Sequence, residues 1–123
     1  MELFKISNLT RFYQNGNKEK QYVLKNISFS LPASGLVCVL GASGSGKSTL
    51  LNLLSLLDKP NSGKIYYQDK DINKFNDKKK NNYLNQETGF IYQQYNLIEE
   101  ESALYNIMLP LLIRGEKEEV ARQ

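Results

Sequence analysis

The sequence predicts an α/β fold with an antiparallel β portion, and three observations support it. Val23–Leu31 alternates apolar and polar residues with a period of two, which is typical of a strand with one buried face. Leu36–Leu40 is a continuous apolar run, as expected of a strand buried on both faces of an α/β sheet. Ser48–Leu57 is rich in leucine and carries no helix breaker, which predicts a largely buried helix.

The other elements of the first half follow from short patterns and turn residues. Leu3–Leu9 is expected to form the first strand, and a polar loop separates it from the second. Pro32–Gly35 has the composition of a turn. Lys64–Tyr67 is expected to be a short strand, and Asp77–Asn85 a surface helix.

The last third of the chain predicts one more β-type run and two helical stretches. Gly89–Tyr92 is the β-type run, and Ser102–Arg114 is a helix capped by its serine and followed by Gly115. Pro110 inside that helix implies a kink or a break. Glu116–Gln123 consists of good helix formers, and the chain then ends, so we expect a chain that is cut within a domain.

Composition excludes several classes of function. The net charge of +3 on 123 residues is too small to indicate nucleic-acid binding. The absence of histidine excludes Ser-His, Cys-His and histidine–metal chemistry within this chain. The single cysteine, Cys38, is expected to be a buried, inert core residue. No signal peptide or membrane span is visible, so we expect a soluble chain whose membrane role, if any, comes through a partner.

A glycine-rich loop carries the strongest chemical signal. It fits G-x-x-x-x-G-K-[ST] at every required position, between a predicted strand and a predicted helix. Its glycines allow the backbone to approach phosphates closely, and successive N–H groups form an anion-binding nest at the start of the helix. The nine residues are Gly41, Ala42, Ser43, Gly44, Ser45, Gly46, Lys47, Ser48 and Thr49.

Two side chains of this loop have expected roles. The Lys47 ammonium would lie against the β- and γ-phosphates of a nucleoside triphosphate, which we expect to be ATP. The Ser48 hydroxyl is a hard oxygen ligand suited to Mg²⁺. The loop therefore predicts an ATP and magnesium site in a P-loop NTPase core.

Four strings in order resemble the ATP-binding subunits of ABC transporters. The first is Val23–Ser28, similar to that family's V-L-K-x-I-S segment, and the second is the loop with its helix, GASGSGKSTLLNLL. Pro60–Ile65 resembles the P-x-S-G-x-I turn, and Gly89–Gln94 resembles the Q-loop. The resemblance covers essentially the whole chain and implies that residues 1–123 are the N-terminal part of a nucleotide-binding domain.

The resemblance implies roles for two further residues. Gln93 matches the glutamine that touches magnesium or the attacking water and reports to the membrane subunit, so it is a candidate metal and catalytic residue together with Lys47. Tyr13 matches the aromatic residue that stacks on adenine, although the neighbouring Phe12 is a second aromatic candidate.

The segment Ala103–Leu111 resembles one group within the family. That group serves lipoprotein release, macrolide export and antimicrobial-peptide export, and Tyr105 departs from its pattern, which has glutamate there. The resemblance implies a transmembrane permease as partner and a second nucleotide-binding domain in a head-to-tail dimer. It also implies a position in the cytoplasm, peripheral on the cytoplasmic face of the membrane.

Parts of the family's hydrolytic site do not occur in the sequence. The Asp-Glu pair that ends the Walker B strand, the L-S-G-G-Q signature and the switch histidine are absent from the 123 residues. We therefore expect the chain to bind ATP without efficient hydrolysis, whereas the complete domain is an ATPase. A small P-loop nucleotide kinase and a non-catalytic nucleotide-binding module remain the alternatives.

Overall fold

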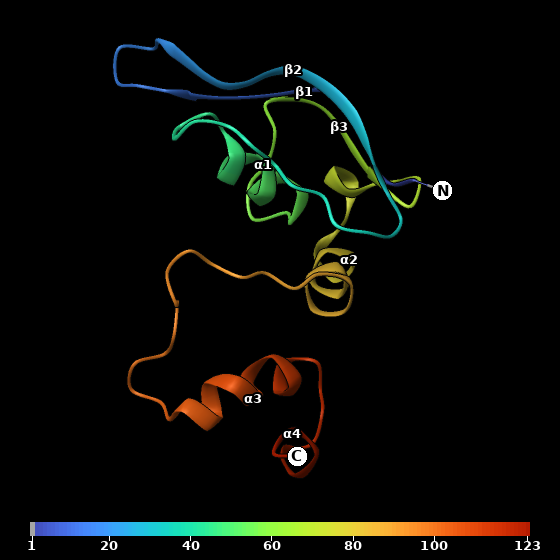
Figure 1. The fold of residues 1–123 in the computed structure, drawn as a ribbon, viewed down its shortest axis with the longest axis vertical. Coiled ribbons are helices and arrows are strands. Elements are labelled where there is room, and N and C mark those ends of the chain that lie inside the picture. Colours follow the sequence, from blue (N-terminus) through green and yellow to red (C-terminus); the bar gives the residue numbers. More distant parts are fainter. Residues whose placement is uncertain (1) are drawn as a thin grey trace. The chain divides into compact units, whose positions relative to one another are not determined.

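The computed structural model describes residues 2–123, which divide into two compact units (Figure 1). The first unit extends to Lys80, and the second covers Asn81–Gln123. Among the described residues, no helix has the length and apolar character needed to cross a bilayer.

The first unit is built on a four-stranded antiparallel sheet. Its strands are β1 (Glu2–Gln14), β2 (Lys20–Pro32), β3 (Ser62–Tyr67) and β4 (Lys70–Asp71). Their order across the sheet is β2-β1-β3-β4, and every neighbouring pair is antiparallel. The predicted antiparallel β portion is therefore confirmed, and both long strands extend beyond the predicted ranges.

The alternation in β2 has the predicted consequence for burial. Ile27, Phe29 and Leu31 are half-buried, whereas the polar residues between them are exposed. Ile6 of β1 lies opposite Phe29, and the two strands bring apolar side chains to the same face of the hairpin.

Helix α1 (Lys47–Leu54) supplies the other side of the core, and it lies beside the sheet in Figure 1. The helix begins one residue before the predicted range Ser48–Leu57 and ends three residues before its end, and Leu50 and Leu53 form its buried side. The buried apolar residues of the first unit come from the strands, from α1 and its C-terminal turn, and from the segment after β4: Ile6, Leu9, Leu24, Leu50, Leu53, Leu56, Ile65 and Ile72.

A close backbone approach fixes the start of β3 against β1. Gly63 has φ +90°, and a Cβ atom there would collide with the Asn8 carbonyl and the Leu9 backbone. The absence of a side chain is therefore what allows β3 to begin at this position.

The predicted buried strand Leu36–Leu40 is wrong for this structure. The segment has no regular secondary structure, and its end residues Leu36 and Leu40 are 91% and 90% exposed. Cys38, expected in the core, is exposed as well. A strand needs hydrogen-bonding partners, and the strands described within residues 2–123 pair only with one another.

The end of the first unit leads into helical structure. A 3-10 turn, η1 (Ile72–Lys74), follows β4, and the Asp71 side chain accepts a hydrogen bond from its Asn73 amide. Helix α2 (Asp77–Asn82) continues into the π-helical turn η2 (Tyr83–Glu87). The predicted helix Asp77–Asn85 is confirmed, with a change of helix type within it.

The second unit contains two further helices, α3 (Ala103–Ile113) and α4 (Glu118–Ala121). The Ser102 hydroxyl caps α3 by accepting from the Tyr105 amide at 3.1 Å, as predicted. Pro110 lies inside α3 without breaking it. The β-type run Gly89–Tyr92 forms no strand, which corrects the prediction, since no described strand pairs with it.

Substitution of Leu53 by alanine tests the core of the first unit. Leu53 is fully buried on α1, so the cavity left by Leu53→Ala should lower the free energy of unfolding by about 2–5 kcal/mol. Leu51 on the same helix is 46% exposed, and Leu51→Ala should cost about 1 kcal/mol or less. Urea unfolding followed by circular dichroism measures both, and equal losses would contradict the described packing of α1.

Candidate functional site

The glycine-rich loop joins the irregular segment 36–40 to helix α1. Residues 41–45 are exposed, and the Ser45 amide donates to the Ala42 carbonyl at 3.2 Å to close a turn. The helix begins at Lys47, and the Gly46 carbonyl accepts the first helical hydrogen bond, from the Leu50 amide at 2.9 Å. The first amides of α1 have no partner within the helix, so the loop leads directly to a set of donors for an anion.

Gly46 fixes where the helix starts relative to the sheet. Its φ of +95° is left-handed, and a Cβ atom at this position would lie 2.9 Å from a methyl of Leu24 and 3.0 Å from the Val23 carbonyl. The loop therefore passes directly against β2 at this residue. Glycine at the last position before Lys47 is required both by the backbone conformation and by the space available.

Lys47 is held by the loop itself. Its ammonium donates to the carbonyls of Gly41 and Ala42 at 2.8 Å each and lies 3.5 Å from the Ser45 hydroxyl. These neutral acceptors orient the charge without cancelling it. Lys47 takes part in none of the ion pairs found among residues 2–123, so its full charge is available to an anionic ligand.

Ser48 and Thr49 occupy the first turn of α1. The Ser48 side chain is exposed at the end of the helix where the free amides lie, and Thr49 is half-buried. An exposed hydroxyl oxygen next to a phosphate-binding loop fits the ligand preference of Mg²⁺, which usually keeps waters and phosphate oxygens as its other ligands. The residues present therefore fit the expected nucleotide and metal.

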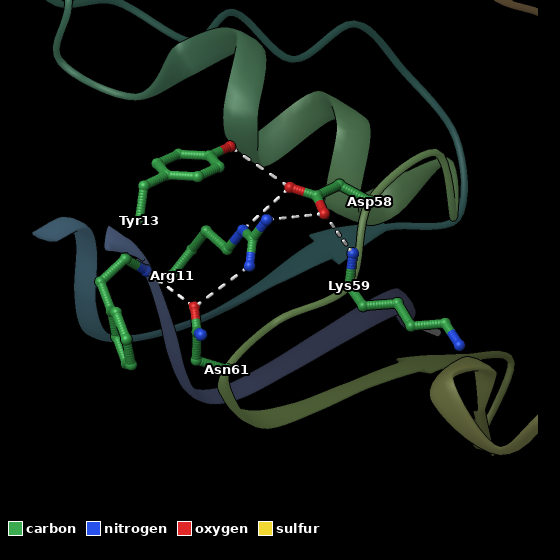
Figure 2. A network of polar contacts seen from close by, with 6 residues as sticks. Arg11, Tyr13, Asp58, Lys59 and Asn61 are labelled. Atoms are coloured by element: carbon green, nitrogen blue, oxygen red, sulfur yellow. Dashed lines mark hydrogen bonds and ion pairs between the residues drawn. The ribbon is translucent and has the colours of Figure 1, made fainter. Parts of the chain in front are cut away.

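Tyr13 is the better placed of the two aromatic candidates on β1. Phe12 is half-buried, packs on Tyr22 with ring centroids 5.3 Å apart, and has the Lys20 ammonium 4.8 Å from its centroid. Tyr13 is 43% exposed and is held by polar contacts to other residues (Figure 2). An exposed ring in a fixed position is suited to stacking, whereas Phe12 is already packed.

Sequence reasoning missed the residues that hold Tyr13. Arg11, Asp58 and Asn61 form a network of polar contacts around it, with partners that lie 45 to 50 residues apart in the chain (Figure 2). In the sequence, Asn61 stands out only as part of the string Pro60–Ile65, and Arg11 and Asp58 carry no recognisable signal. No spacing in the sequence relates Asp58 or Asn61 to β1, because the sheet and α1 bring them together.

Gln93 belongs to the second unit, in an exposed segment without regular structure. The structure of this unit shows how the neighbouring turn is held. Asn106 of α3 accepts from the Ile98 amide at 2.8 Å and donates to the carbonyls of Ile98 and Ser102. The assignment of Gln93 to magnesium or to the attacking water remains a prediction.

Comparison with known families gives the loop its context. Residues 24–123 match the family model described as "ABC transporter". The chain belongs to the ABC transporter family. The matched range includes the whole loop, α1 and Gln93, and it begins within β2.

Four curated relatives with high similarity share the name lipoprotein-releasing system ATP-binding protein LolD. The chain is 44% identical over 121 residues to that of Idiomarina loihiensis, covering 98% of the chain and 53% of the relative. It is 40% identical over 121 residues to that of Saccharophagus degradans, with 98% and 53% covered. The chain thus spans about half the length of the curated relatives it matches.

Solved structures show the same fold. A dimeric structure of MJ0796, described as a bacterial ABC transporter cassette, superposes with a TM-score of 0.89 at 36% identity. It covers 97% of this chain, which covers 52% of that chain. A second structure of MJ0796, in a post-hydrolysis state bound to ADP and Pi, gives 0.88 at the same identity and coverage. The predicted α/β fold with an antiparallel β subdomain is confirmed as the corresponding part of an ABC cassette.

Substitutions of Gly46 and Gly44 test how closely the loop passes β2. Both have positive φ, +95° and +78°, so alanine at either position should cost about 1–2 kcal/mol in backbone strain. Gly44 has no atom within 4 Å of an added Cβ, whereas at Gly46 an added Cβ would lie 2.9–3.0 Å from atoms of Leu24 and Val23. Gly46→Ala should therefore lower the free energy of unfolding by about 1–3 kcal/mol more than Gly44→Ala. Urea unfolding of the two variants checks this, and equal losses would show that the loop does not pack on β2.

Proposed function

We propose that this chain is the phosphate-binding portion of the ATP-binding subunit of an ABC transporter. The observation that carries the proposal is Lys47, which the loop carbonyls hold at the start of α1 with no carboxylate to neutralise it. A cation and free helix amides at one place form a site for the phosphates of ATP. The bound ADP and Pi in MJ0796 support the nucleotide assignment.

Each residue of the site has a distinct part in binding. The amides of residues 44–49 would surround the phosphate oxygens, and Lys47 would donate to the β- and γ-phosphates. Ser48, with Gln93 as a second candidate, would provide oxygen ligands for Mg²⁺, which when bound neutralises charge on the phosphates. Tyr13 would stack on the base. Stacking tolerates any base, so ATP selectivity requires further contacts.

The proposed partners follow from the relatives. We infer that the complete protein pairs head to tail with a second nucleotide-binding domain, and the dimeric MJ0796 structure supports this. We also infer a transmembrane permease partner, with the chain on the cytoplasmic face of the membrane. Exposed apolar side chains on α3, among them Ile107 at 73% and Ile113 at 59%, provide surface for a protein partner.

Lipoprotein release is the proposed transport process. Four curated relatives have this system in their name, and their matches cover 87–98% of this chain. The resemblance of Ala103–Leu111 to the group that includes lipoprotein release agrees with it. The complete protein would couple ATP binding and hydrolysis to this process.

Lys47→Ala tests the phosphate site. Loss of a charge-assisted hydrogen bond to phosphate should weaken ATP binding by about 1.5–3 kcal/mol, or roughly 10- to 150-fold. Isothermal titration of Mg-ATP against the purified chain measures the dissociation constant. Lys64→Ala is the matched control, because Lys64 is an exposed lysine on β3, and it should leave the affinity unchanged.

The same titration separates the proposal from its alternatives. A nucleotide kinase should also bind a nucleoside monophosphate as phosphate acceptor, whereas an ABC subunit should prefer ATP over AMP. Failure of the folded chain to bind Mg-ATP at all would contradict the proposed function.

The isolated 123-residue chain should hydrolyse ATP negligibly. Phosphoryl transfer depends on positioning and electrostatic stabilisation of the attacking water and the leaving phosphate. This chain contains no histidine, no L-S-G-G-Q string and no apolar strand ending in Asp-Glu, so it has no group to supply the missing contacts. Release of phosphate, measured with a coupled assay, should stay at the level of the Lys47→Ala variant. Steady turnover that Lys47→Ala abolishes would overturn this expectation.

A further inference from the structure

The ring of Tyr13 is held at two points by residues from separate parts of the first unit. The Arg11 guanidinium carbon lies 4.4 Å from the ring centroid, over one face of the ring. The Tyr13 hydroxyl donates to a carboxylate oxygen of Asp58 at 3.3 Å (Figure 2). Tyr13 is nonetheless 43% exposed, so much of the ring remains available to a ligand.

Arg11 is itself fixed by three hydrogen bonds. Its Nε and one terminal nitrogen donate to the two oxygens of Asp58 at 2.9 Å each, and its other terminal nitrogen lies 3.3 Å from the Asn61 side-chain oxygen. The Arg11 and Asp58 side chains are only 19% and 26% exposed. A bidentate, partly buried ion pair of this kind is better ordered than an ordinary surface ion pair.

The turn before β3 also fixes the backbone beneath the ring. The Asn61 side-chain oxygen accepts from the Phe12 amide at 2.8 Å, and the Asn61 amide donates to the Thr10 carbonyl at 3.0 Å. The strand is therefore held on both sides of Arg11. The orientation of the next residue but one, Tyr13, is set by this backbone as well as by its own side-chain contacts.

Asp58 connects this arrangement to the helix that carries the phosphate loop. The amides of Leu57 and Asp58 both donate to the Asn52 carbonyl of α1, at 2.9 and 3.2 Å. The Asp58 carboxylate also accepts from the Lys59 amide at 2.7 Å, which fixes its own orientation. Helix α1 begins at Lys47 and ends at Leu54, so the helix and its C-terminal turn connect the loop to Asp58.

We propose that Arg11 and Asp58 are positioning residues that hold Tyr13 as a preformed platform for the nucleotide base. The guanidinium covers one face of the ring and leaves the opposite face for the base. Because Asp58 is attached to α1, the platform keeps a fixed place relative to the bound phosphates. This inference rests on the proposed nucleotide function and concerns the base, whereas Lys47 and the loop concern the phosphates.

The proposal has a specific energetic consequence. A ring that is already oriented loses little side-chain freedom when the base stacks on it, whereas a free ring would lose that freedom on binding. Loss of the contacts that orient the Tyr13 ring should therefore weaken only the part of the ATP affinity that comes from stacking on the base. ATP and inorganic tripolyphosphate share the phosphate contacts and differ in the nucleoside, so their affinity ratio isolates this part.

The test is titration of Mg-ATP and Mg-tripolyphosphate into the original chain and four variants. Tyr13→Ala should lower the ratio of ATP to tripolyphosphate affinity by about fivefold or more, as expected for loss of base stacking. Arg11→Leu should lower it by about three- to fivefold, and should add nothing in the Tyr13→Ala background. Arg122→Leu removes the exposed pair between Glu118 of α4 and Arg122, which directly follows the helix, and should leave the ratio unchanged.

The inference is overturned if Arg11→Leu leaves the ratio of ATP to tripolyphosphate affinity unchanged, whether both affinities stay the same or both fall by the same factor. Equal weakening would indicate a role in general stability alone. Should Arg11→Leu fail to fold, Tyr13→Phe keeps the ring and removes only the hydroxyl that donates to Asp58. The ratio should then fall by about twofold, and an unchanged ratio overturns the inference.

The two proposals fail in distinguishable ways. Binding of neither ligand by the folded original chain would overturn the phosphate-site proposal and this inference with it. Binding of both ligands, with a ratio that Tyr13→Ala and Arg11→Leu leave unchanged, would overturn this inference alone.

Discussion

The central strand β1 hydrogen-bonds to β2 along one edge and to β3 along the other, and the first unit takes its form from these two pairings. The β2 pairing turns the apolar residues of the hairpin toward α1. The β3 pairing is possible because Gly63 has no side chain to meet the β1 backbone. The turn before β3 then lies next to the far end of β1, where Arg11 and Tyr13 are found. The same constraint therefore builds the core and brings together the network around Tyr13.

Local patterns predicted the elements that depend on local chemistry. The alternation of β2, the leucines of α1 and the Ser102 cap of α3 each correspond to a physical preference that acts over a few residues. The phosphate loop belongs with them, because its glycines, Lys47 and the start of α1 are consecutive in the chain. The hydrogen bonds from Lys47 to the loop carbonyls give the expected site its geometry.

The features that the sequence did not predict depend on partners remote in the chain. Arg11 and Asp58 are 47 residues apart, and nothing in their spacing indicates contact. The prediction of a buried strand at Leu36–Leu40 was wrong because this segment lacks such a partner among the described residues. Its apolar composition is suited to a strand between two neighbours, but no described strand pairs with it, and it lies exposed. Apolar composition shows that a segment could be buried in a sheet, but it is buried there only when neighbouring strands pair with it.

The two basic side chains at the site have different electrostatic roles. Arg11 is paired with the Asp58 carboxylate at 2.9 Å, which largely neutralises its charge. Its role is therefore to hold neighbouring side chains in place. Lys47 is held by two loop carbonyls and lies near the Ser45 hydroxyl, and these neutral acceptors do not neutralise its charge. A phosphate chain needs a free positive charge, and a neutral base needs a fixed surface. Under the proposed function, the first unit would separate the two tasks, with attraction of the phosphates at the N-terminal end of α1 and orientation of the base beyond its C-terminal end.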